Sequence, residues 1–279
     1  MMAKAGVATA VDYAGPIESV IDYMMTFGAG LNISCMESVR PEYNLPVDAP
    51  KREVGRVVDN ALKKGAVGIK IMGGHYPLTP ETTAHVIKCC NEKKVGVAFH
   101  CGSLATGSHL NGFKESVQLA DGQRLYIPHI NGYCRGLVKD PQTELAEAFE
   151  ILKQSANIIS DLLVKFGAIT LQEMVQKMCY VPAQVYGFEK KGYLEEGADA
   201  DITVVDYEKG KPYMTIVCGQ VIMVDGIVLG QKGTLYISEH AQLEQDIPSA
   251  FSNVEKGFYK KKILKGFFFM CRNRNMIFN

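Results

Sequence analysis

The stretch GAVGIKIMGGHYPLTPETT, from Gly65 to Thr83, joins a short apolar run to a glycine pair and a helix start. The run AVGIKIM predicts a buried strand, because its apolar residues are nearly continuous. Thr79, Pro80 and Glu81 predict a helix start, since threonine is a good N-cap, proline suits the first helical position and a carboxylate suits the first turn. Lys70 lies inside the predicted strand, where a buried ammonium is costly unless it is paired, neutralised or chemically modified.

Strands and helices alternate on both sides of this stretch. Further strands are predicted at 7–13, 31–36, 95–100 and 124–130, and helices at 16–28, 51–65, 79–94, 109–122 and 141–157. Strand followed by helix, repeated about every thirty residues, is typical of parallel βαβ units. We therefore expect an α/β fold containing a (β/α) barrel, with a doubly wound open sheet as the alternative.

After Asn157 the alternation breaks, so the expected TIM-like barrel is incomplete. A capping box at Thr170 and Glu173 begins another helix. From Gly192 onward, short apolar runs separated by Gly and Asp-Gly turns predict a small antiparallel β-sandwich remnant. The expected division is a partial barrel at 1–180, a C-terminal β-sandwich segment at 181–235 and an uncertain basic tail at 236–279.

The composition is that of an ordinary soluble globular protein. The 279 residues are 47% apolar and 22% charged, and the formal net charge is zero. Neutrality argues against nucleic acid as a partner, and no apolar run is long enough to predict a membrane span. The eight cysteines contain no C-x-x-C pair, which predicts a cytoplasmic protein with reduced thiols.

Three residues share one position in the predicted fold. Lys70, His100 and His129 each lie at or near the carboxyl end of a predicted strand, one strand–helix unit apart. In a (β/α) barrel this rim holds the active site, and consecutive strands are neighbours. A single histidine there is more often structural, and a single lysine usually extends outward to solvent. Three in successive units favour a metal site, because neutral imidazoles are good zinc ligands.

The segments GIKIMGG, VAFHCGS and LYIPHINGYCRG resemble the core of the amidohydrolase superfamily, in its dihydroorotase, hydantoinase and D-aminoacylase branch. A second stretch, VPAQVYGFEKKGYLEEGADADITVVD at 181–206, resembles the family's return into its β-sandwich. The resemblance implies that Lys70 is a carboxylated lysine and that His100 and His129 are the histidine ligands of strands five and six. It implies one or two divalent metals, with zinc as the first candidate, and a small-molecule substrate.

The implied activity is hydrolysis of carbon–nitrogen bonds other than peptide bonds, in cyclic amides or N-acyl amino acids, by a metal-bound hydroxide. His75, Asn131 and Arg135 are the substrate-binding candidates, with Arg135 suited to a substrate carboxylate. The alternatives are that His75 caps a loop and that Arg135 forms an ion pair on the surface.

The chain departs from the family pattern at two ligand positions. The strand-one His-x-His pair and the strand-eight aspartate are absent, with Asp161 the one nearby candidate for the latter, so no catalytic residue is assigned. The alternative function is a catalytically inactive fragment or pseudoenzyme of the same fold, including a homo-oligomer that completes an open barrel.

Overall fold

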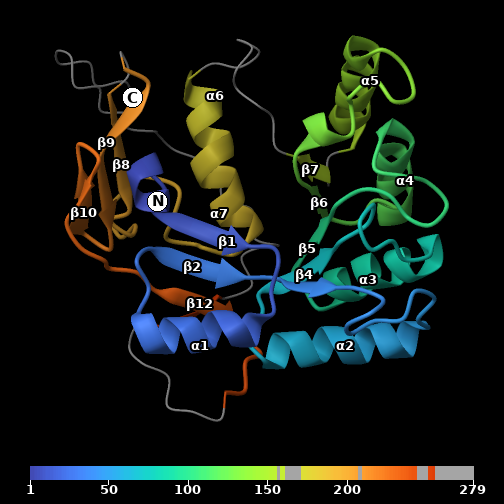
Figure 1. The fold of residues 1–279 in the computed structure, drawn as a ribbon, viewed down its shortest axis with the longest axis horizontal. Coiled ribbons are helices and arrows are strands. Elements are labelled where there is room, and N and C mark those ends of the chain that lie inside the picture. The colour runs from blue at the N-terminus through green and yellow to red at the C-terminus, as the bar shows by residue number, and fades with distance from the viewer. Residues whose placement is uncertain (156–157, 161–170, 207–208, 244–250, 255–279) are drawn as a thin grey trace.

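A five-stranded parallel sheet lies at the centre of the fold (Figure 1). The computed structural model describes residues 1–155, 158–160, 171–206, 209–243 and 251–254. The strands run in the order of the sequence: β3 (Glu37–Val39), β4 (Gly68–Ile71), β5 (Gly96–Phe99), β6 (Leu125–Ile127) and β7 (Ile158–Ser160). The helices that connect them are α2 (Lys51–Lys63), α3 (Pro80–Glu92), α4 (Leu110–Ala120) and α5 (Pro141–Gln154). This succession confirms the predicted α/β architecture with parallel strands.

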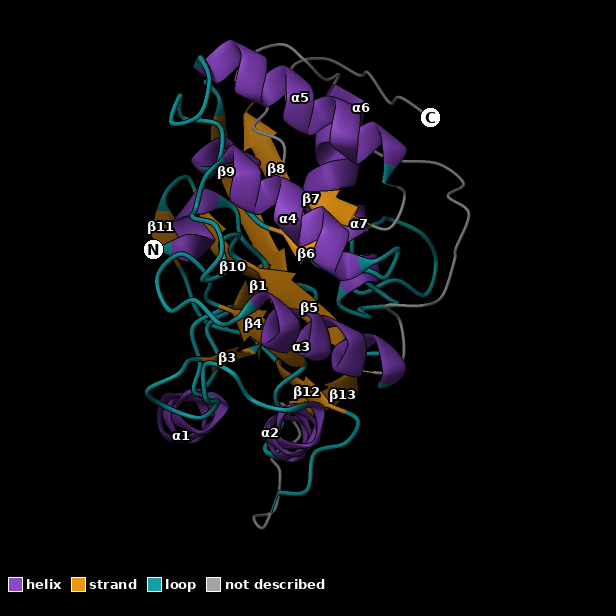
Figure 2. Ribbon diagram, turned by 90° about the vertical axis from the view of Figure 1, so that its right-hand side faces the viewer, coloured by secondary structure: helices purple, strands orange, loops and turns teal. Residues whose placement is uncertain are grey.

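The connecting helices cover one face of this sheet, as Figure 2 shows for α3, α4 and α5. Successive side chains of a strand point to opposite faces. Ile69, Ile71, Val97 and Phe99 accordingly lie in the main apolar core with residues of these helices. Lys70, between the two isoleucines, points to the other face.

A second parallel sheet continues from the first. It contains β1 (Thr9–Asp12), β2 (Asn32–Cys35), β12 (Leu235–Ser238) and β13 (Phe251–Val254), in that order. Only Met36 separates β2 from β3, so one run of chain contributes to both sheets. Helix α1 (Ile17–Phe27) joins β1 to β2. Within the described residues β1 and β7 are both edge strands, and a closed barrel is not observed.

The inner face of the five-stranded sheet is covered by a helical segment rather than by further strands. The segment comprises α6 (Leu171–Val175), a π-helical turn (Gln176–Tyr180) and α7 (Val181–Val185). Its end packs against the sheet through Tyr186 and Phe188, in one apolar cluster with Met36 and Ala98. The Tyr186 ring lies 6.2 Å from the ring of Tyr126.

The antiparallel module predicted near the end of the chain is present. It consists of β8 (Ile202–Asp206), β9 (Lys211–Val217), β10 (Gln220–Val224) and β11 (Ile227–Val228), in the order β11-β10-β9-β8. The β10–β11 hairpin turns at Asp225 and Gly226, both with positive φ, as expected of a type I′ turn. Val217, Ile222 and Met223 of this module pack with Ala3 and Leu31 near the start of the chain.

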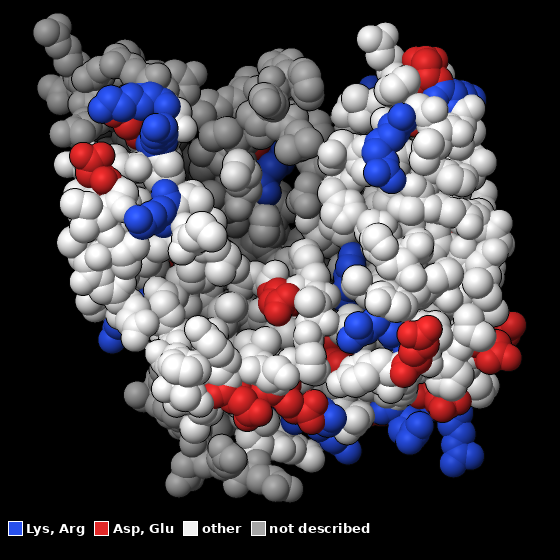
Figure 3. Space-filling view, in the orientation of Figure 1, with Lys and Arg blue, Asp and Glu red and all other residues white. Residues whose placement is uncertain are grey.

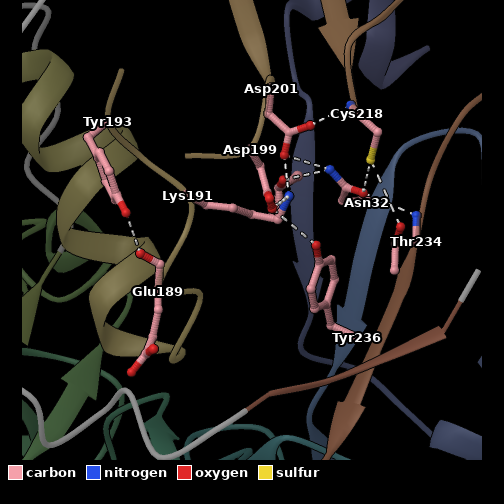
Figure 4. A network of polar contacts seen from close by, with 10 residues as sticks. Asn32, Glu189, Lys191, Tyr193, Asp199, Asp201, Cys218, Thr234 and Tyr236 are labelled. Atoms are coloured by element: carbon pink, nitrogen blue, oxygen red, sulfur yellow. Dashed lines mark hydrogen bonds and ion pairs between the residues drawn. The ribbon is translucent and has the colours of Figure 1, made fainter. Parts of the chain in front are cut away.

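A buried polar network joins the antiparallel module to the second parallel sheet (Figure 4). Lys191, which is 4% exposed, pairs with Asp199 at 2.9 Å and with Asp201. Asn32 of β2 donates to Asp201 at 2.8 Å and accepts from the backbone N–H of Thr234 at 3.1 Å. Every polar group of this network has a partner, which is the condition for burying it without a large cost.

The domain limits expected at 180/181 and 235/236 stay a prediction. Helix α7 lies beyond the first limit and packs on the five-stranded sheet, while β12 lies across the second limit and pairs with β2. Thr170, Asp161 and the basic residues of 255–279 lie outside the described residues.

The described surface carries charges of both signs. Figure 3 shows lysine, arginine, aspartate and glutamate side by side along the lower margin, over α1 and α2. This mixture fits the zero net charge of the chain. None of the described helices combines the length and the apolar character needed to cross a membrane.

Candidate metal and substrate site

Lys70 is buried on the inner face of the sheet. It pairs in register with Ser38 of β3 and Ala98 of β5, and its side chain is 4% exposed. Its Nζ finds no hydrogen-bond partner among the described residues and lies 5.5 Å from the centroid of the Tyr13 ring. Burial lowers the pKa of Lys70 to about 8, because desolvation penalises the charged amine.

His100 follows β5 directly and lies at the centre of a cluster of imidazoles. Its backbone N–H donates to the carbonyl of Ile71 at 3.0 Å, and its Nε2 lies 2.9 Å from Ser108 Oγ. Its ring centroid is 4.8 Å from that of His75 and 4.8 Å from that of His129.

The electrostatic surroundings of His100 keep its imidazole neutral. Burial is the largest cause, followed by the positive charges of His129, Lys70, His75 and Arg135, and together they lower the pKa to about 4. A neutral imidazole is the form that binds metal ions. The residues named as acting on this ring are all basic ones.

The loop after β4 packs closely against the backbone of the loop after β5. A Cβ on Gly73 would lie 2.4 Å from the carbonyl oxygen of Gly102 and 2.5 Å from that of His100, so only glycine fits there. The next residue, Gly74, donates its N–H to Gly102 at 2.9 Å. This contact holds His75 beside His100.

His129 and Tyr133 occupy the turn after β6. His129 has φ 43°, in the left-handed region, and precedes a 3-10 turn at Ile130–Gly132. The Tyr133 ring is fully buried and lies 5.5 Å from the rings of both His100 and His129. Its hydroxyl accepts the backbone N–H of Cys101 at 3.2 Å. Tyr133 therefore supports both imidazoles.

The structure brings together four of the six predicted site residues, namely Lys70, His75, His100 and His129. Arg135 is exposed and acts on His100 through its charge. Asn131 is exposed on the 3-10 turn, with no contact to the imidazoles in the described part of the chain. Sequence reasoning missed Tyr13, Ser108 and Tyr133; the one available signal was an aromatic residue four positions after His129 in HINGYCRG.

Two observations limit the metal site. Among the described residues, no group of three or more His, Cys, Asp or Glu side chains could hold a metal ion. A metal centre at this rim would therefore need Lys70 as a ligand, because lysine is not one of the four residue types in such a group. A hollow of about 740 Å³ lies elsewhere, along α2, and none of the predicted site residues lines it.

Sequence comparison gives the same family over a part of the chain that includes the 181–206 stretch and lies beyond Lys70, His100 and His129. A sequence model described as "Amidohydrolase family" matches residues 139–234. The dihydroorotase of Pyrococcus furiosus is 37% identical over 92 residues, covering 24% of this chain and 22% of that protein. The dihydroorotase of Streptococcus pneumoniae is 44% identical over 55 residues, covering 20% and 13%.

The chain is thus similar to amidohydrolases over part of its length. Solved structures share its fold at low sequence identity. A D-hydantoinase from Bacillus sp. AR9 has a TM-score of 0.60 at 15% identity, covering 87% of this chain and 83% of that one. An N-acyl-D-glutamate deacylase from Bordetella bronchiseptica, solved with zinc and a phosphonate inhibitor, has a TM-score of 0.60 at 12% identity, with 83% coverage of both chains. Matches to the curated dihydroorotases quoted above extend over less than a quarter of their length.

Proposed function

We propose that this chain is a member of the amidohydrolase superfamily and a metal-dependent hydrolase of carbon–nitrogen bonds other than peptide bonds, with a cyclic amide or an N-acyl amino acid as substrate. The observation that carries the proposal is the meeting of Lys70, His100 and His129 at the carboxyl edge of one parallel sheet. In barrel enzymes of this layout the active site lies at that edge. The dihydroorotases, hydantoinases and deacylases similar to this chain act on amides of these kinds.

The donor set fits a divalent metal, zinc being the first choice. Two adjacent imidazoles, one of them held neutral, are suitable nitrogen ligands. Lys70 is a buried amine without a hydrogen-bond partner in the described structure. A neutral amine adds carbon dioxide, forming a C–N bond and releasing a proton, and the resulting carbamate is an anionic ligand. When bound, the metal supplies a Lewis acid for the amide carbonyl and lowers the pKa of water.

The remaining residues hold the ligands and exclude water. Ser108 Oγ lies 2.9 Å from Nε2 of His100, and Tyr133 packs against the rings of His100 and His129. Such supporting contacts orient metal ligands and select their tautomer. Tyr13 and Tyr186 close the site from the inner side of the sheet, beside Lys70. His75 is placed to contact the substrate at the open side.

The second candidate is an inactive member of the superfamily. It is favoured by one observation, that the described residues contain no metal-competent group of three His, Cys, Asp or Glu side chains. A chain of this kind would keep the fold without a positioned general base, and so without efficient turnover.

Metal content and turnover together test both candidates. Wild type, Lys70→Ala, His100→Ala and His129→Ala are compared with His240→Ala, whose side chain is 46% exposed and remote from β4 to β6 in the sequence. We expect at least half an equivalent of zinc, manganese or nickel in wild type and His240→Ala, and a loss of about tenfold or more in the other three variants.

The same proteins are assayed on dihydroorotate, dihydrouracil, hydantoin and N-acetyl-D-glutamate. The hydrolase is supported if wild type and His240→Ala hydrolyse one of these compounds and the variants at Lys70, His100 and His129 do not. Absence of hydrolysis of all four compounds by wild type, with or without bound metal, supports the inactive member. Less than a tenth of an equivalent in wild type, or unchanged metal in Lys70→Ala, contradicts the metal site.

A further inference from the structure

The hollow along α2 lies apart from the imidazole cluster. It has a volume of about 740 Å³, and neither Lys70 nor any of the three imidazoles lines it. One wall is α2 itself, seen end-on in Figure 2, from Arg52 to the helix C-cap at Lys64. The other wall includes Tyr43 and Asn44, in the loop between β3 and α2. Small-molecule sites in proteins have volumes of about 300–1,000 Å³, so a ligand of ordinary size fits the hollow.

The acidic side chains that line the hollow already have partners. They are Glu37 and Asp59. Glu37 is 6% exposed, and its Oε2 accepts the backbone N–H of Ile17 at 3.0 Å. The carboxylate of Asp59 pairs with Lys93 at 2.5 Å. Neither group therefore repels an incoming anion as an unpaired carboxylate would.

Three exposed cations of α2 are available to an anion in the hollow. Arg52 and Lys63 make no ion pair with any described residue, and Arg56 pairs with Glu53 on the helix surface at 3.4 Å. Their spacing of four and seven residues places the three cations on one face of the helix, in a stripe about 16 Å long at about 1.5 Å per residue. Like charges four positions apart, such as Arg52 and Arg56, destabilise a helix that has no anion beside it.

A glycine within the helix opens its backbone to the hollow. Gly55 lies inside α2 and lines the hollow, and a Cβ built on it would meet no heavy atom of the described structure within 4 Å. Glycine inside a helix is destabilising relative to alanine, and here no close contact among the described residues requires it. The missing side chain leaves room for a ligand to lie against α2 beside Arg52 and Arg56.

The facing loop holds an exposed aromatic ring in a defined position. Tyr43 is 51% exposed, and the guanidinium of Arg40 lies 5.2 Å from the centroid of its ring. Asn44 fixes the loop, because its Oδ1 accepts the backbone N–H of Arg40 at 3.1 Å and its Nδ2 donates to the carbonyl of Ser38 at 2.9 Å. An exposed ring of this kind is a platform on which a nucleic-acid base stacks.

We propose that the hollow is a binding site for a nucleotide with two or more phosphate groups. Arg52, Arg56 and Lys63 bind the phosphates, and Tyr43 stacks on the base. Three cations spread over about three helical turns suit a chain of phosphates better than a single carboxylate, and each guanidinium binds two phosphate oxygens at once. The site is independent of the hydrolase proposed above, because the two share no residue.

Binding of nucleotides and of a phosphate chain without a base tests the proposal. Dissociation constants for ATP, GTP, UTP and inorganic tripolyphosphate are measured by calorimetry in EDTA, so that a metal at the rim does not bind the phosphates. Wild type should bind at least one nucleotide tenfold more tightly than tripolyphosphate. Arg52→Gln and Lys63→Gln should each weaken that nucleotide about tenfold. Tyr43→Ala should weaken it about tenfold and leave tripolyphosphate within twofold.

The matched control is Lys51→Gln, which removes an exposed charge from the same helix outside the hollow and should behave as wild type. Gly55→Leu is the sharpest variant. Leucine is the better helix former and meets no described atom there, so the thermal midpoint should rise while nucleotide binding weakens tenfold or more.

Four results would each overturn the proposal. They are no binding of any of the three nucleotides by wild type, equal affinity for nucleotide and tripolyphosphate, unchanged nucleotide binding in Gly55→Leu, and unchanged nucleotide binding in Arg52→Gln. Arg52 is exposed, so its variant tests the site without disturbing the core. Lys70→Ala should bind the nucleotide as wild type does, and loss of binding in this variant would place the nucleotide at the rim and contradict the site on α2.

Discussion

Lys70 shows how much one residue can predict. Its place in an apolar strand, one repeat before His100 and another before His129, predicts that all three lie at one edge, because parallel strands end on the same side. The structure places them there. The contacts of Tyr133 and Ser108 with the imidazoles could not be predicted, since they depend on the path of two loops and leave no periodic signal in the sequence.

Replacement of Lys70 by methionine should stabilise the metal-free protein at pH 7. The pKa of Lys70 is lowered from 10.5 to about 8 by burial, so folding penalises the protonated amine. The penalty is full below pH 8 and disappears as the pH rises to 10.5; at about 1.4 kcal/mol per pH unit it reaches about 3 kcal/mol at most. Urea unfolding of Lys70→Met and wild type at pH 7 and pH 9.5, in carbon dioxide-free buffer with EDTA, measures it.

The gain should be larger at pH 7 than at pH 9.5. Lys88→Met is the control, because Lys88 is exposed on α3, and it should change stability by less than about 0.5 kcal/mol. A Lys70→Met variant less stable than wild type at both pH values would show that the amine has a stabilising partner.

At the scale of elements, alternation predicted β1, β2, β4, β5 and β6 and α1 to α5, because each carries its own period and its own start and stop residues. It did not predict β3, which follows β2 after a single residue. Thr79, for example, accepts the N–H of Thr82 as the predicted N-cap. The position of α7 could not be predicted. Its apolar residues predict that it is buried, but not that it lies on the inner face of the sheet, in the cluster with Met36 and Ala98. The partner of an apolar face is a tertiary property.

Truncation of Tyr186 should destabilise the fold strongly. Tyr186 is 8% exposed, and its ring packs against the rings of Tyr13 and Tyr126, at 6.2 Å from each. Tyr186→Ala leaves a cavity there and should cost about 3–5 kcal/mol. Tyr186→Phe keeps the ring and loses only the hydroxyl bond to Tyr13, so it should cost about 1 kcal/mol. Equal losses in the two variants, by chemical denaturation, would contradict this packing role.

At the scale of the whole molecule, the polar network around Lys191 couples the antiparallel module to the parallel sheets. The hairpin turns in the sequence predicted the antiparallel module. They did not predict that Lys191 pairs with Asp199 and Asp201, or that Asn32, from a distant part of the chain, binds Asp201. Burial lowers the pKa of Lys191, and the hydrogen bond and charge of Asp201 more than offset it, so that the pKa is raised. The ammonium is therefore retained at neutral pH.

Loss of this ammonium should unfold both parts together. Lys191→Met leaves two carboxylates without their cation, one of them 8% exposed, and should cost about 3–5 kcal/mol. Lys209→Met, in an exposed pair with Asp206 of the same module, should cost less than about 1 kcal/mol. Thermal unfolding monitored by circular dichroism and by tyrosine fluorescence should show one shifted transition. Two separated transitions in Lys191→Met would contradict the expectation that both parts unfold together, and an unshifted midpoint would contradict the stabilising role of the network.

The position of β12 has a consequence for biosynthesis. Leu235 pairs with Ile33 of β2, and Ser238 donates to the carbonyl of Gly65. During translation, β2 leaves the ribosome long before its partner has been made. Contacts this distant in sequence slow folding and leave strand edges open meanwhile. The edge of β2 that pairs with β12 therefore stays open until about residue 238 has emerged, and an open strand edge can pair with other polypeptides.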